Sequence, residues 1–467
     1  MFAPASPKAL VTLVSMPFRE GLCFQYEGKL RWHRAVPKWS VLWQIPSVAL
    51  TNRVSFEIEN RARAGEGHGG LNHVHFLCIL GVLGGPGLGR CRKMWWQSVP
   101  GETMNVSRDC FHVESKIEKA WTLPASLYTD PQVFLAEKKT IFSRTWQVVG
   151  HADQVANAGD YFTTELAGEP LLCVRGSDGK LRGFYNVCRH RAGPAAEGCG
   201  SRKLFRCGYH GWTYALDGSL VHATEIEGME GFRVEDFALA PVRIEAWFNL
   251  VFVNLDPQAR TLRACLGSLP GQAEKFPFTE MKLFERRTYD MKCNWKTYVD
   301  NYLEGYHLPS VHPGLNRELD YDAYVVEPYA HHVRQFSPIR GAQPGDEIPR
   351  RYGEARGNLT TDYFWIFPNW MLNCYPDHVS LNVVLPLESE RSLAIFEWYL
   401  PEKDHAAPAA KASVEFSDQI QREDVAICEI VQKNLRSRSY SRGRFSVKQE
   451  PGVHAFHRIY AEAMQPA

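Results

Sequence analysis

Short apolar runs, broken by glycine and aspartate, dominate the chain between residues 161 and 256. The runs YFTTEL, PLLCVRG and LRGFYNVC have the length and composition of strands. The segments GSDGK and LDGS are typical of tight turns that join antiparallel strands. The run FNLVFVNLD, at residues 248–256, predicts the last strand of a small all-β domain.

Helical periodicity occurs on both sides of that domain. In residues 131–146, PQVFLAEKKTIFSRTW, the side chains Phe134, Leu135, Ile141 and Phe142 recur at helical spacing. After residue 256, helical segments such as NWKTYVDNYLEGYH and FSDQIQREDVAICEIVQKNL alternate with strands such as VSLNVVLPL and RSLAIFEWYL. We therefore predict an α+β fold, in which an all-β domain precedes an α+β domain with an antiparallel sheet.

Residues 1–103 differ from the rest of the chain in amino-acid composition and in hydrophobic periodicity. They contain 12 Lys and Arg, 6 Glu and no Asp, and no helical or strand periodicity runs through them. One interpretation is an extra domain or a targeting segment. The other, which we favour, is that translation begins at Met104 and that this atypical extension is not native.

Composition and charge exclude several classes of protein. The chain has 467 residues, of which 45% are apolar, as in an ordinary globular protein. Its net charge of +1 is too small to attract nucleic acid or an anionic membrane by electrostatics. The run FLCILGVLGGPGLG, residues 76–89, is too short and too rich in glycine for a spanning helix. Twelve cysteines are too sparse for a disulfide scaffold. We expect a cytoplasmic protein with no nucleic-acid and no membrane partner.

Three cysteines and two histidines lie within NVCRHRAGPAAEGCGSRKLFRCGYHGWTYALDG. Cys188 and His190 form C-x-H, and Cys207 and His210 form C-x-x-H. A zinc finger pairs two cysteines in one half and two histidines in the other, so these mixed halves disfavour structural zinc. They favour a [2Fe–2S] cluster in which both cysteines bind one iron and both histidines bind the other. Cys199 is interpreted as an ordinary loop cysteine.

These residues, together with the segment GYHGWTYALDG, closely resemble the Rieske [2Fe–2S] domain. The resemblance assigns Cys188, His190, Cys207 and His210 to the cluster. Neutral imidazole replaces charged thiolate on one iron, which raises the reduction potential to about −150 to +300 mV.

A second constellation lies in NWKTYVDNYLEGYHLPSVH, residues 294–312. Glu304 and His307 are three residues apart, which would put them on one helix face. His307 and His312 are five apart, and the neighbouring prolines predict a break between them that lets His312 swing back. Two histidines and a distant carboxylate form the facial triad that binds non-haem Fe(II) and leaves positions open for O₂ and substrate.

This segment resembles the iron-binding helix of the Rieske non-haem iron oxygenases, catalytic α subunit. The resemblance runs from about residue 123 to the C-terminus and implies a helix-grip-like catalytic domain. We expect a helical segment at 104–144, a Rieske domain at 145–256 and a mononuclear-iron domain at 257–467. The atypical extension, 1–103, lies outside the resemblance.

The resemblance also implies roles for five polar residues. Glu304 would link the two metal sites, and Asp300 and Asn301 match family positions beside the iron. The segment QREDVAICEIVQ resembles the part of the family that supplies the third ligand, for which we choose Asp424, with Glu423 left open. A competing view makes Glu304 itself an iron ligand in place of Asp424.

Members of the family act as terminal oxygenases. They receive electrons that originate from NAD(P)H through a separate reductase or ferredoxin, and they use O₂ to oxidise a small molecule. In such proteins the cluster of one subunit faces the mononuclear iron of its neighbour, so the resemblance implies a homo-oligomer, a trimer or a multiple of it. It does not decide between mono- and dioxygenation.

The aromatic-rich segment at residues 363–387 looks more like members that act on choline, betaine and similar quaternary ammonium compounds. Aromatic rings can hold a trimethylammonium group by cation–π contact. The aromatic residues of this segment that we propose for such a contact are Phe364, Trp365, Phe367, Trp370 and Tyr375. An aromatic substrate that is hydroxylated or dihydroxylated is the alternative. A non-catalytic Rieske electron carrier is the rival class, but it would need neither His307 nor His312.

Overall fold

The computed structural model describes residues 108–340 and 359–465 and four short strands nearer the N-terminus, with side chains described from residue 110 onward except Thr279. The four strands form two antiparallel pairs. These are β1 (Thr12–Leu13) with β2 (Phe24–Gln25), and β3 (Ser40–Trp43) with β4 (Asn52–Ser55). Contacts divide the chain into Met1–Glu102 and Thr103–Ala467. The interpretation of residues 1–103 as non-native lies outside the described residues.

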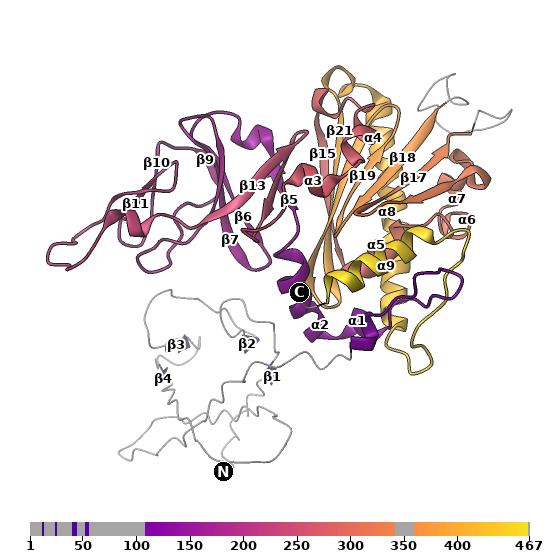
Figure 1. Ribbon diagram of the computed structural model, residues 1–467, viewed down its shortest axis with the longest axis horizontal. Helices are drawn as coiled ribbons and strands as arrows, with labels where there is room; N and C mark the ends of the chain where they lie inside the picture. The colour runs from indigo at the N-terminus through magenta and orange to yellow at the C-terminus, as the bar shows by residue number, and fades with distance from the viewer. Residues whose placement is uncertain are drawn as a thin grey trace, which may run out of the picture. The chain divides into compact units, whose positions relative to one another are not determined.

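The first large sheet of Thr103–Ala467 is antiparallel and has seven strands (Figure 1). Its members are β5 (Gln147–His151), β6 (Asp160–Leu166), β7 (Glu169–Arg175), β8 (Leu181–Tyr185), β9 (Cys199–Ser201), β13 (Pro241–Trp247) and β14 (Leu250–Asn254). They lie in the order β5–β14–β13–β8–β7–β6–β9. A smaller antiparallel sheet joins β10 (Leu204–Arg206), β11 (Thr213–Ala215) and β12 (Leu220–His222). The predicted all-β domain is therefore confirmed.

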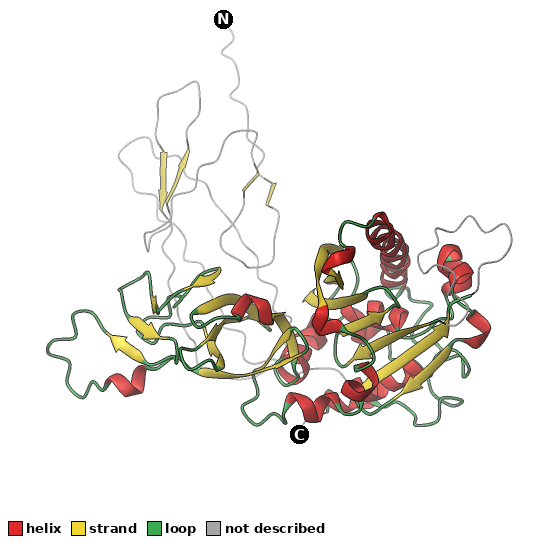
Figure 2. Ribbon diagram, turned by 90° about the horizontal axis from the view of Figure 1, so that it is seen from above, coloured by secondary structure: helices red, strands yellow, loops and turns green. Residues whose placement is uncertain are grey.

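The second large sheet is also antiparallel and seven-stranded. Its members are β15 (Met281–Met291), β16 (Val325–Pro328), β17 (His332–Pro338), β18 (Thr360–Ile366), β19 (Trp370–Cys374), β20 (Val379–Glu388) and β21 (Arg391–Pro401). They lie in the order β15–β21–β20–β19–β18–β17–β16. Figure 2 shows that the helices gather around this sheet, whereas the first domain is mostly strand and loop.

Nine α-helices belong to the described part of the chain. They are α1 (Ser126–Thr129), α2 (Pro131–Glu137), α3 (Leu262–Leu266), α4 (Leu269–Ala273), α5 (Trp295–Tyr302), α6 (Leu308–Val311), α7 (Pro313–Glu318), α8 (Pro408–Asn434) and α9 (Pro451–Ala463). The long helix α8 lies against the sheet, where Asp418 accepts a 2.6 Å hydrogen bond from the Tyr289 hydroxyl of β15. Across the described residues, none of these helices has the length and apolar character that a bilayer span requires.

The helix predicted for residues 131–146 forms in part. Helix α2 ends at Glu137, a single π-helical turn follows at Lys138–Phe142, and the helix stops there. The predicted apolar face is also shifted, because Val133 is buried and Leu135 is 49% exposed. The shift places the Glu137 carboxylate in the interior, where it pairs with the ammonium group of Lys296 on α5.

This pair helps to join the N-terminal helices to α5. Trp295 Nε1 and the Tyr460 hydroxyl also donate to Glu137, at 2.9 Å and 2.7 Å. Helices α2, α5 and α9 are thereby joined through one carboxylate. Because a buried charge is costly unless it is paired and hydrogen-bonded, removal of either partner would destabilise all three helices.

Candidate active site

The two Cys/His pairs lie on two loops that approach each other. Asn186 shapes the first loop, because its side-chain oxygen accepts from the Ala195 and Ala196 amides at 3.0 Å each. In the second loop the Cys207 amide donates to the Trp212 carbonyl at 2.8 Å. The loops bring the rings of His190 and His210 to a centroid separation of 4.6 Å.

The surroundings of these four residues suit a bound metal cluster. His190 stacks on Trp212 with a centroid distance of 4.8 Å, and its buried Nδ1 has no hydrogen-bond partner among the described residues. Cys188 and Cys207 are both buried. Burial raises the pKa of the Cys207 thiol, and the neighbouring Cys188 sulfur raises it further. Two buried cysteine sulfurs and an unpaired imidazole nitrogen form a donor set that fits a [2Fe–2S] cluster.

Two smaller features lie beside the cysteine sulfurs. A Cβ on Gly193 would lie 2.9 Å from the Cys207 sulfur, so only glycine fits beside that ligand. The Tyr214 hydroxyl donates to the Cys188 sulfur at 3.2 Å. Cys199 is exposed, lies in β9 and pairs with Phe162 of β6, in keeping with its interpretation as an ordinary cysteine.

Residues 294–312 differ in detail from the helix that the sequence predicts. Helix α5 begins at an Asn294 cap, whose side chain accepts from the Lys296 amide at 2.9 Å, and ends at Tyr302. The expectation that Glu304 and His307 share a helix face is wrong, because Glu304 lies beyond the end of α5. One turn, α6, follows His307, and the backbone leaves helical geometry at His312, with φ −119° and ψ 68°. The predicted break in the helix is therefore present, and it lies at His312, directly after α6.

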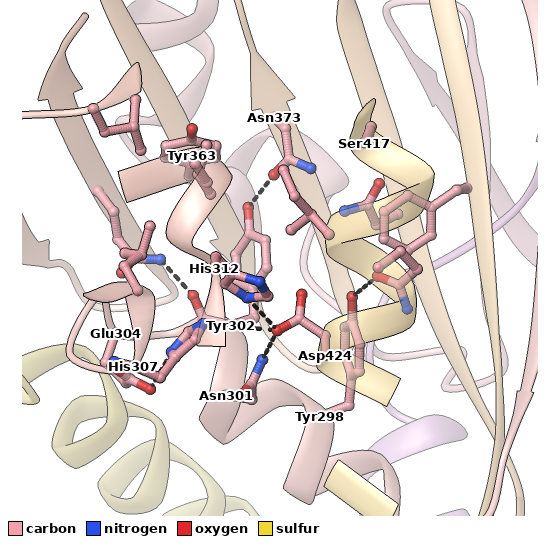
Figure 3. Close-up of a pocket in the computed structure, with 18 of the residues that line it drawn as sticks. Tyr298, Asn301, Tyr302, Glu304, His307, His312, Tyr363, Asn373, Ser417 and Asp424 are labelled. Atoms are coloured by element: carbon pink, nitrogen blue, oxygen red, sulfur yellow. Dashed lines mark hydrogen bonds and ion pairs between the residues drawn. The ribbon is translucent and has the colours of Figure 1, made fainter. Parts of the chain in front are cut away.

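The break lets both histidines turn toward the same carboxylate on α8. His312 Nε2 lies 2.9 Å and His307 Nε2 lies 3.6 Å from Oδ1 of Asp424. Donor atoms of these three residues all lie within 4.8 Å of one another (Figure 3). Two imidazoles and one carboxylate on one side of a cavity form the donor set that binds non-haem Fe(II).

The other ring nitrogens each contact a different glutamate. His307 Nδ1 lies 2.6 Å from Glu304 Oε1, and His312 Nδ1 lies 2.7 Å from Glu423 Oε2. A carboxylate at Nδ1 holds the proton there and leaves Nε2 free to bind a metal. Glu423 therefore lies on the far side of His312 from Asp424. Burial alone lowers the pKa of His312, but the carboxylates of Asp424 and Glu423 outweigh burial and raise it.

The side chains of Asn301 and Asp300 have different surroundings, because only Asn301 contacts Asp424. The Asn301 amide donates to Asp424 Oδ1 at 2.6 Å and so orients that carboxylate. Asp300 does not line the cavity. It accepts from the Tyr128 hydroxyl at 2.6 Å and lies 2.9 Å from His457 Nε2, which connects α5 to α1 and α9.

The cavity beside the two histidines and Asp424 is rich in tyrosine. Its walls come from α5 to α8 and from strands β17 to β21 of the second sheet, and Figure 3 shows this pocket. The lining residues that bear on ligand binding are Tyr298, Tyr302, Tyr324, Gln335, Tyr363, Asn373, Tyr375, Asn382, Phe396 and Gln421. Burial raises the pKa of Tyr302, Tyr324 and Tyr363 well above the ordinary tyrosine value, so these phenols stay neutral.

Of the aromatic residues proposed for a ligand cage, only Tyr375 lines the cavity. Phe364 and Trp370 are buried in a core cluster that includes Phe252 of the first sheet. Trp365 belongs to the core beneath α9, where Phe367 packs against it. Side chains alternate along a strand, so Phe364 points to the face opposite Tyr363.

Sequence reasoning missed Tyr298, Tyr302, Tyr324, Tyr363 and every cavity amide except Asn301. A partial signal existed for Gln421, because it lies three residues before Asp424 and therefore shares a face of the same helix. The spacing of Asn373 and Tyr375, two apart next to a strand, also predicts a common face. No local signal brings α8 to these strands.

Comparisons with known proteins agree with this geometry. Residues 145–233 match the Rieske [2Fe-2S] domain, and residues 278–466 match the ring hydroxylating alpha subunit catalytic domain. Choline monooxygenase of Arabidopsis thaliana is 35% identical over 362 residues, which cover 74% of this chain and 84% of that protein. The carnitine monooxygenase oxygenase subunit of Escherichia coli K12 is 34% identical over 364 residues, covering 74% and 95%.

A solved structure of a quaternary ammonium Rieske monooxygenase superposes with a TM-score of 0.69 at 29% identity. The match covers 78% of this chain and 100% of that one. The two domain matches occur in the predicted order, the relatives are more than 30% identical, and the solved structure shares the fold. These findings all assign the chain to the same family. The chain belongs to the Rieske non-haem iron oxygenases, as a catalytic α subunit.

Proposed function

We propose that this oxygenase hydroxylates or N-dealkylates a small quaternary ammonium compound. The observation that carries the proposal is the tyrosine-rich cavity beside His307, His312 and Asp424. Neutral phenol rings attract a trimethylammonium group by cation–π contact, which gains strength where water is excluded. No Lys or Arg occurs among the described lining residues, so no like charge repels the cation there.

The family uses a Rieske [2Fe–2S] cluster, a mononuclear iron and O₂, and the residues described above fit both metal groups. We assign Cys188, His190, Cys207 and His210 to the cluster. His307, His312 and Asp424 are assigned to the mononuclear iron, which when bound would supply the activation of O₂ with electrons from the cluster. The protein supplies the ring orientation that leaves each Nε2 free, through the carboxylates at Nδ1.

Asn301 and Glu304 act through the ligands that they contact. The Asn301 amide holds Asp424, and the Glu304 carboxylate holds His307 and also accepts from two backbone amides. We retain Glu304 as the link between the two metal sites, rather than as an iron ligand. Its Oε1 faces the outer nitrogen of His307, and Asp424 is on the inner side. Asp300 supports α5 through Tyr128 and His457.

Electron delivery from a neighbouring subunit is part of the proposal. Strands β10 and β11, which flank the second Cys/His pair, lie at the opposite end of Thr103–Ala467 from α6 and α7 (Figure 1). The carnitine-oxidising relative is described with inter-subunit electron transfer. We therefore propose a homo-oligomer, a trimer or a multiple of it, that takes electrons from a separate reductase or ferredoxin.

The proposed domain limits are 104–144 for the N-terminal helical segment, 145–256 for the Rieske domain and 257–467 for the catalytic domain. The second sheet and the long helix α8 against it support a helix-grip-like description of the last of these. A non-catalytic electron carrier would not need the donor set on α6 and α8.

A substrate screen tests the function. The iron-loaded protein, with a surrogate reductase and NAD(P)H, should consume O₂ in proportion to product with choline-like or betaine-like compounds. Aromatic acids and hydrocarbons serve as the comparison set. Coupled turnover confined to that set would replace the proposal with ring or side-chain hydroxylation. An absence of coupled uptake with any quaternary ammonium compound would contradict it.

A further inference from the structure

Two surface loops of Thr103–Ala467 carry opposite charge. Residues 223–236 follow β12 and contain five acidic residues and one basic residue, so we call this segment the acidic loop. Residues 436–448 lie between α8 and α9 and contain five basic residues and no acidic one, so we call this segment the basic loop. These ten side chains are all exposed, and they are Glu225, Glu227, Glu230, Glu235 and Asp236 in the first and Arg436, Arg438, Arg442, Arg444 and Lys448 in the second.

Most of these charges have no partner in their own chain. The ion pairs that do form join Asp236 to Arg233, at 3.5 Å, and Arg436 to Glu390. Across the part of the chain that the structure describes, no other charged side chain of either loop takes part in an ion pair. Exposed charge of one sign attracts a partner surface of the opposite sign.

Aromatic contacts hold the acidic loop beside the cluster donors. The rings of Phe232 and Phe237 stack on each other with a centroid distance of 4.6 Å. Both also contact the Trp212 ring, at 5.8 Å and 5.5 Å, and Trp212 stacks on His190. The position of the acidic loop is therefore fixed relative to the proposed [2Fe–2S] cluster.

Backbone contacts hold the basic loop near the turn that carries Glu304. The Gly443 carbonyl accepts from the Thr122 amide at 3.1 Å, and the Gly443 amide donates to the Thr122 hydroxyl at 2.8 Å. Just after the loop, Gly452 packs so closely that a Cβ there would lie 2.5 Å from the Leu303 carbonyl oxygen. Leu303 directly precedes Glu304, so the basic loop ends close to the outer side of the proposed iron site.

The two loops of one chain do not meet. Strand β11 lies at one end of Thr103–Ala467, and α8 and α9 lie in the other half (Figure 1). In the proposed homo-oligomer, however, the cluster of one copy faces the Glu304 turn of the next copy. The acidic loop beside the cluster then comes to the same interface as the neighbour's basic loop.

We infer that the acidic loop of one copy docks on the basic loop of the neighbouring copy. This inference rests on the proposed homo-oligomer and names a contact that aligns the cluster with the neighbour's iron site. Exposed apolar side chains occur among the charges on both sides, Met229 and Val234 on the acidic loop and Tyr440 and Val447 on the basic loop. Unlike patches form a head-to-tail contact, which closes into a ring when the rotation between copies permits it.

Charge reversal of each loop tests the contact in the full-length protein loaded with cluster and iron. Glu227→Lys with Glu230→Lys reverses the acidic loop, and Arg438→Glu with Arg442→Glu reverses the basic loop. Each change places like charges opposite each other, so sedimentation should show a subunit dissociation constant raised about 10- to 100-fold at low ionic strength. Added salt should reduce this effect, because it screens exposed charges.

Exchange of the charges distinguishes direct contact from a general loss of stability. The variant with all four substitutions again has opposite charges on the two loops, so it should recover the wild-type dissociation constant. Glu274→Lys with Glu280→Lys is the matched control, because it changes the net charge by the same amount at two exposed residues outside the loops. It should leave the dissociation constant unchanged, and the cluster absorbance reports correct folding in every variant.

The outcomes separate this contact from other roles of the loops. Reversals that act no more strongly than the control, or a charge exchange that restores nothing, overturn the inference. If reversal of the acidic loop slows only the reduction of the cluster by the surrogate reductase, the loop binds the electron donor and the inference is wrong. If the wild-type protein is a monomer at all concentrations, the proposed homo-oligomer fails and the inference fails with it. The substrate screen tests the quaternary ammonium function independently.

Discussion

Replacement of Glu304 by glutamine tests how this side chain sets the tautomer of His307. One carboxylate oxygen faces His307 Nδ1 at 2.6 Å, and the other accepts from the backbone amides of Tyr306 and His307. All three partners donate to the carboxylate when the ring proton is on Nδ1. A glutamine has one oxygen and one NH₂ group, so it cannot accept from both sides.

The substitution is therefore expected to weaken the binding of iron. Without metal, the introduced glutamine can turn its oxygen to the amides and its NH₂ group to Nδ1, which moves the ring proton to Nε2. Iron needs a free Nε2, so binding forces the side chain to turn and give up two amide hydrogen bonds. At about 0.5–1.5 kcal/mol each, the loss is about 1–3 kcal/mol, or roughly a five- to 150-fold weaker iron affinity.

Glu423→Gln is the matched control, because it also removes one negative charge beside Nδ1 of a histidine. Its second oxygen accepts from the Gln419 side chain at 3.1 Å, which can turn its own amide to suit. Anaerobic Fe(II) titration should therefore show a clearly larger loss of affinity for Glu304→Gln than for Glu423→Gln. Equal losses, or wild-type affinity in Glu304→Gln, would refute the reasoning. The cluster absorbance should stay unchanged in both variants.

Three further predictions concern the metal sites and pH. Cys207→Ala should lose the visible absorbance and the EPR signal of the reduced cluster, and colour that persists would show that the cluster lies elsewhere. Asp424→Ala should fall from three irons to two per chain with an intact cluster, as iron quantitation and absorbance would show. The pKa of the buried His332 is lowered to about 4, first by desolvation and then by the nearby His331. As the pH falls below about 6.5, this histidine therefore binds a proton in the unfolded chain but not in the folded one. Stability should drop by about 2 kcal/mol between pH 7 and pH 5, and a His332→Gln variant that shows the same drop in urea unfolding would contradict this.

Local spacing in the sequence was enough to propose both metal-binding motifs. C-x-H and C-x-x-H lie on two neighbouring loops within one small domain, so the spacing carries the donor set directly. His307 and His312 are similarly close, and the prolines beside them predict the change of direction. Strand lengths and turn residues likewise predicted the all-β domain. Such features depend on backbone preferences over a few residues, which a single sequence contains.

The position of Glu304 shows where local reasoning failed. Spacing of three residues suggested a shared helix face with His307, but α5 stops at Tyr302. The two residues meet because the carboxylate accepts from the amides of a turn and then reaches the ring. Helical spacing and a capped turn give the same contact, and only the tertiary structure distinguishes them.

The substrate cavity depends on the tertiary structure almost completely. Tyr363 lines the cavity and Phe364 enters the core between the sheets, although both are aromatic and adjacent. The pleat sends neighbours to opposite faces, but which face meets α8 depends on how the whole sheet packs. Gln421 and Asn382 reach one cavity from a helix and a strand that are distant in sequence. The sequence by itself indicated the chemistry of the two metal sites, because the ligands proposed for them are mostly local. The packing of α8 against the second sheet decided what can bind beside them.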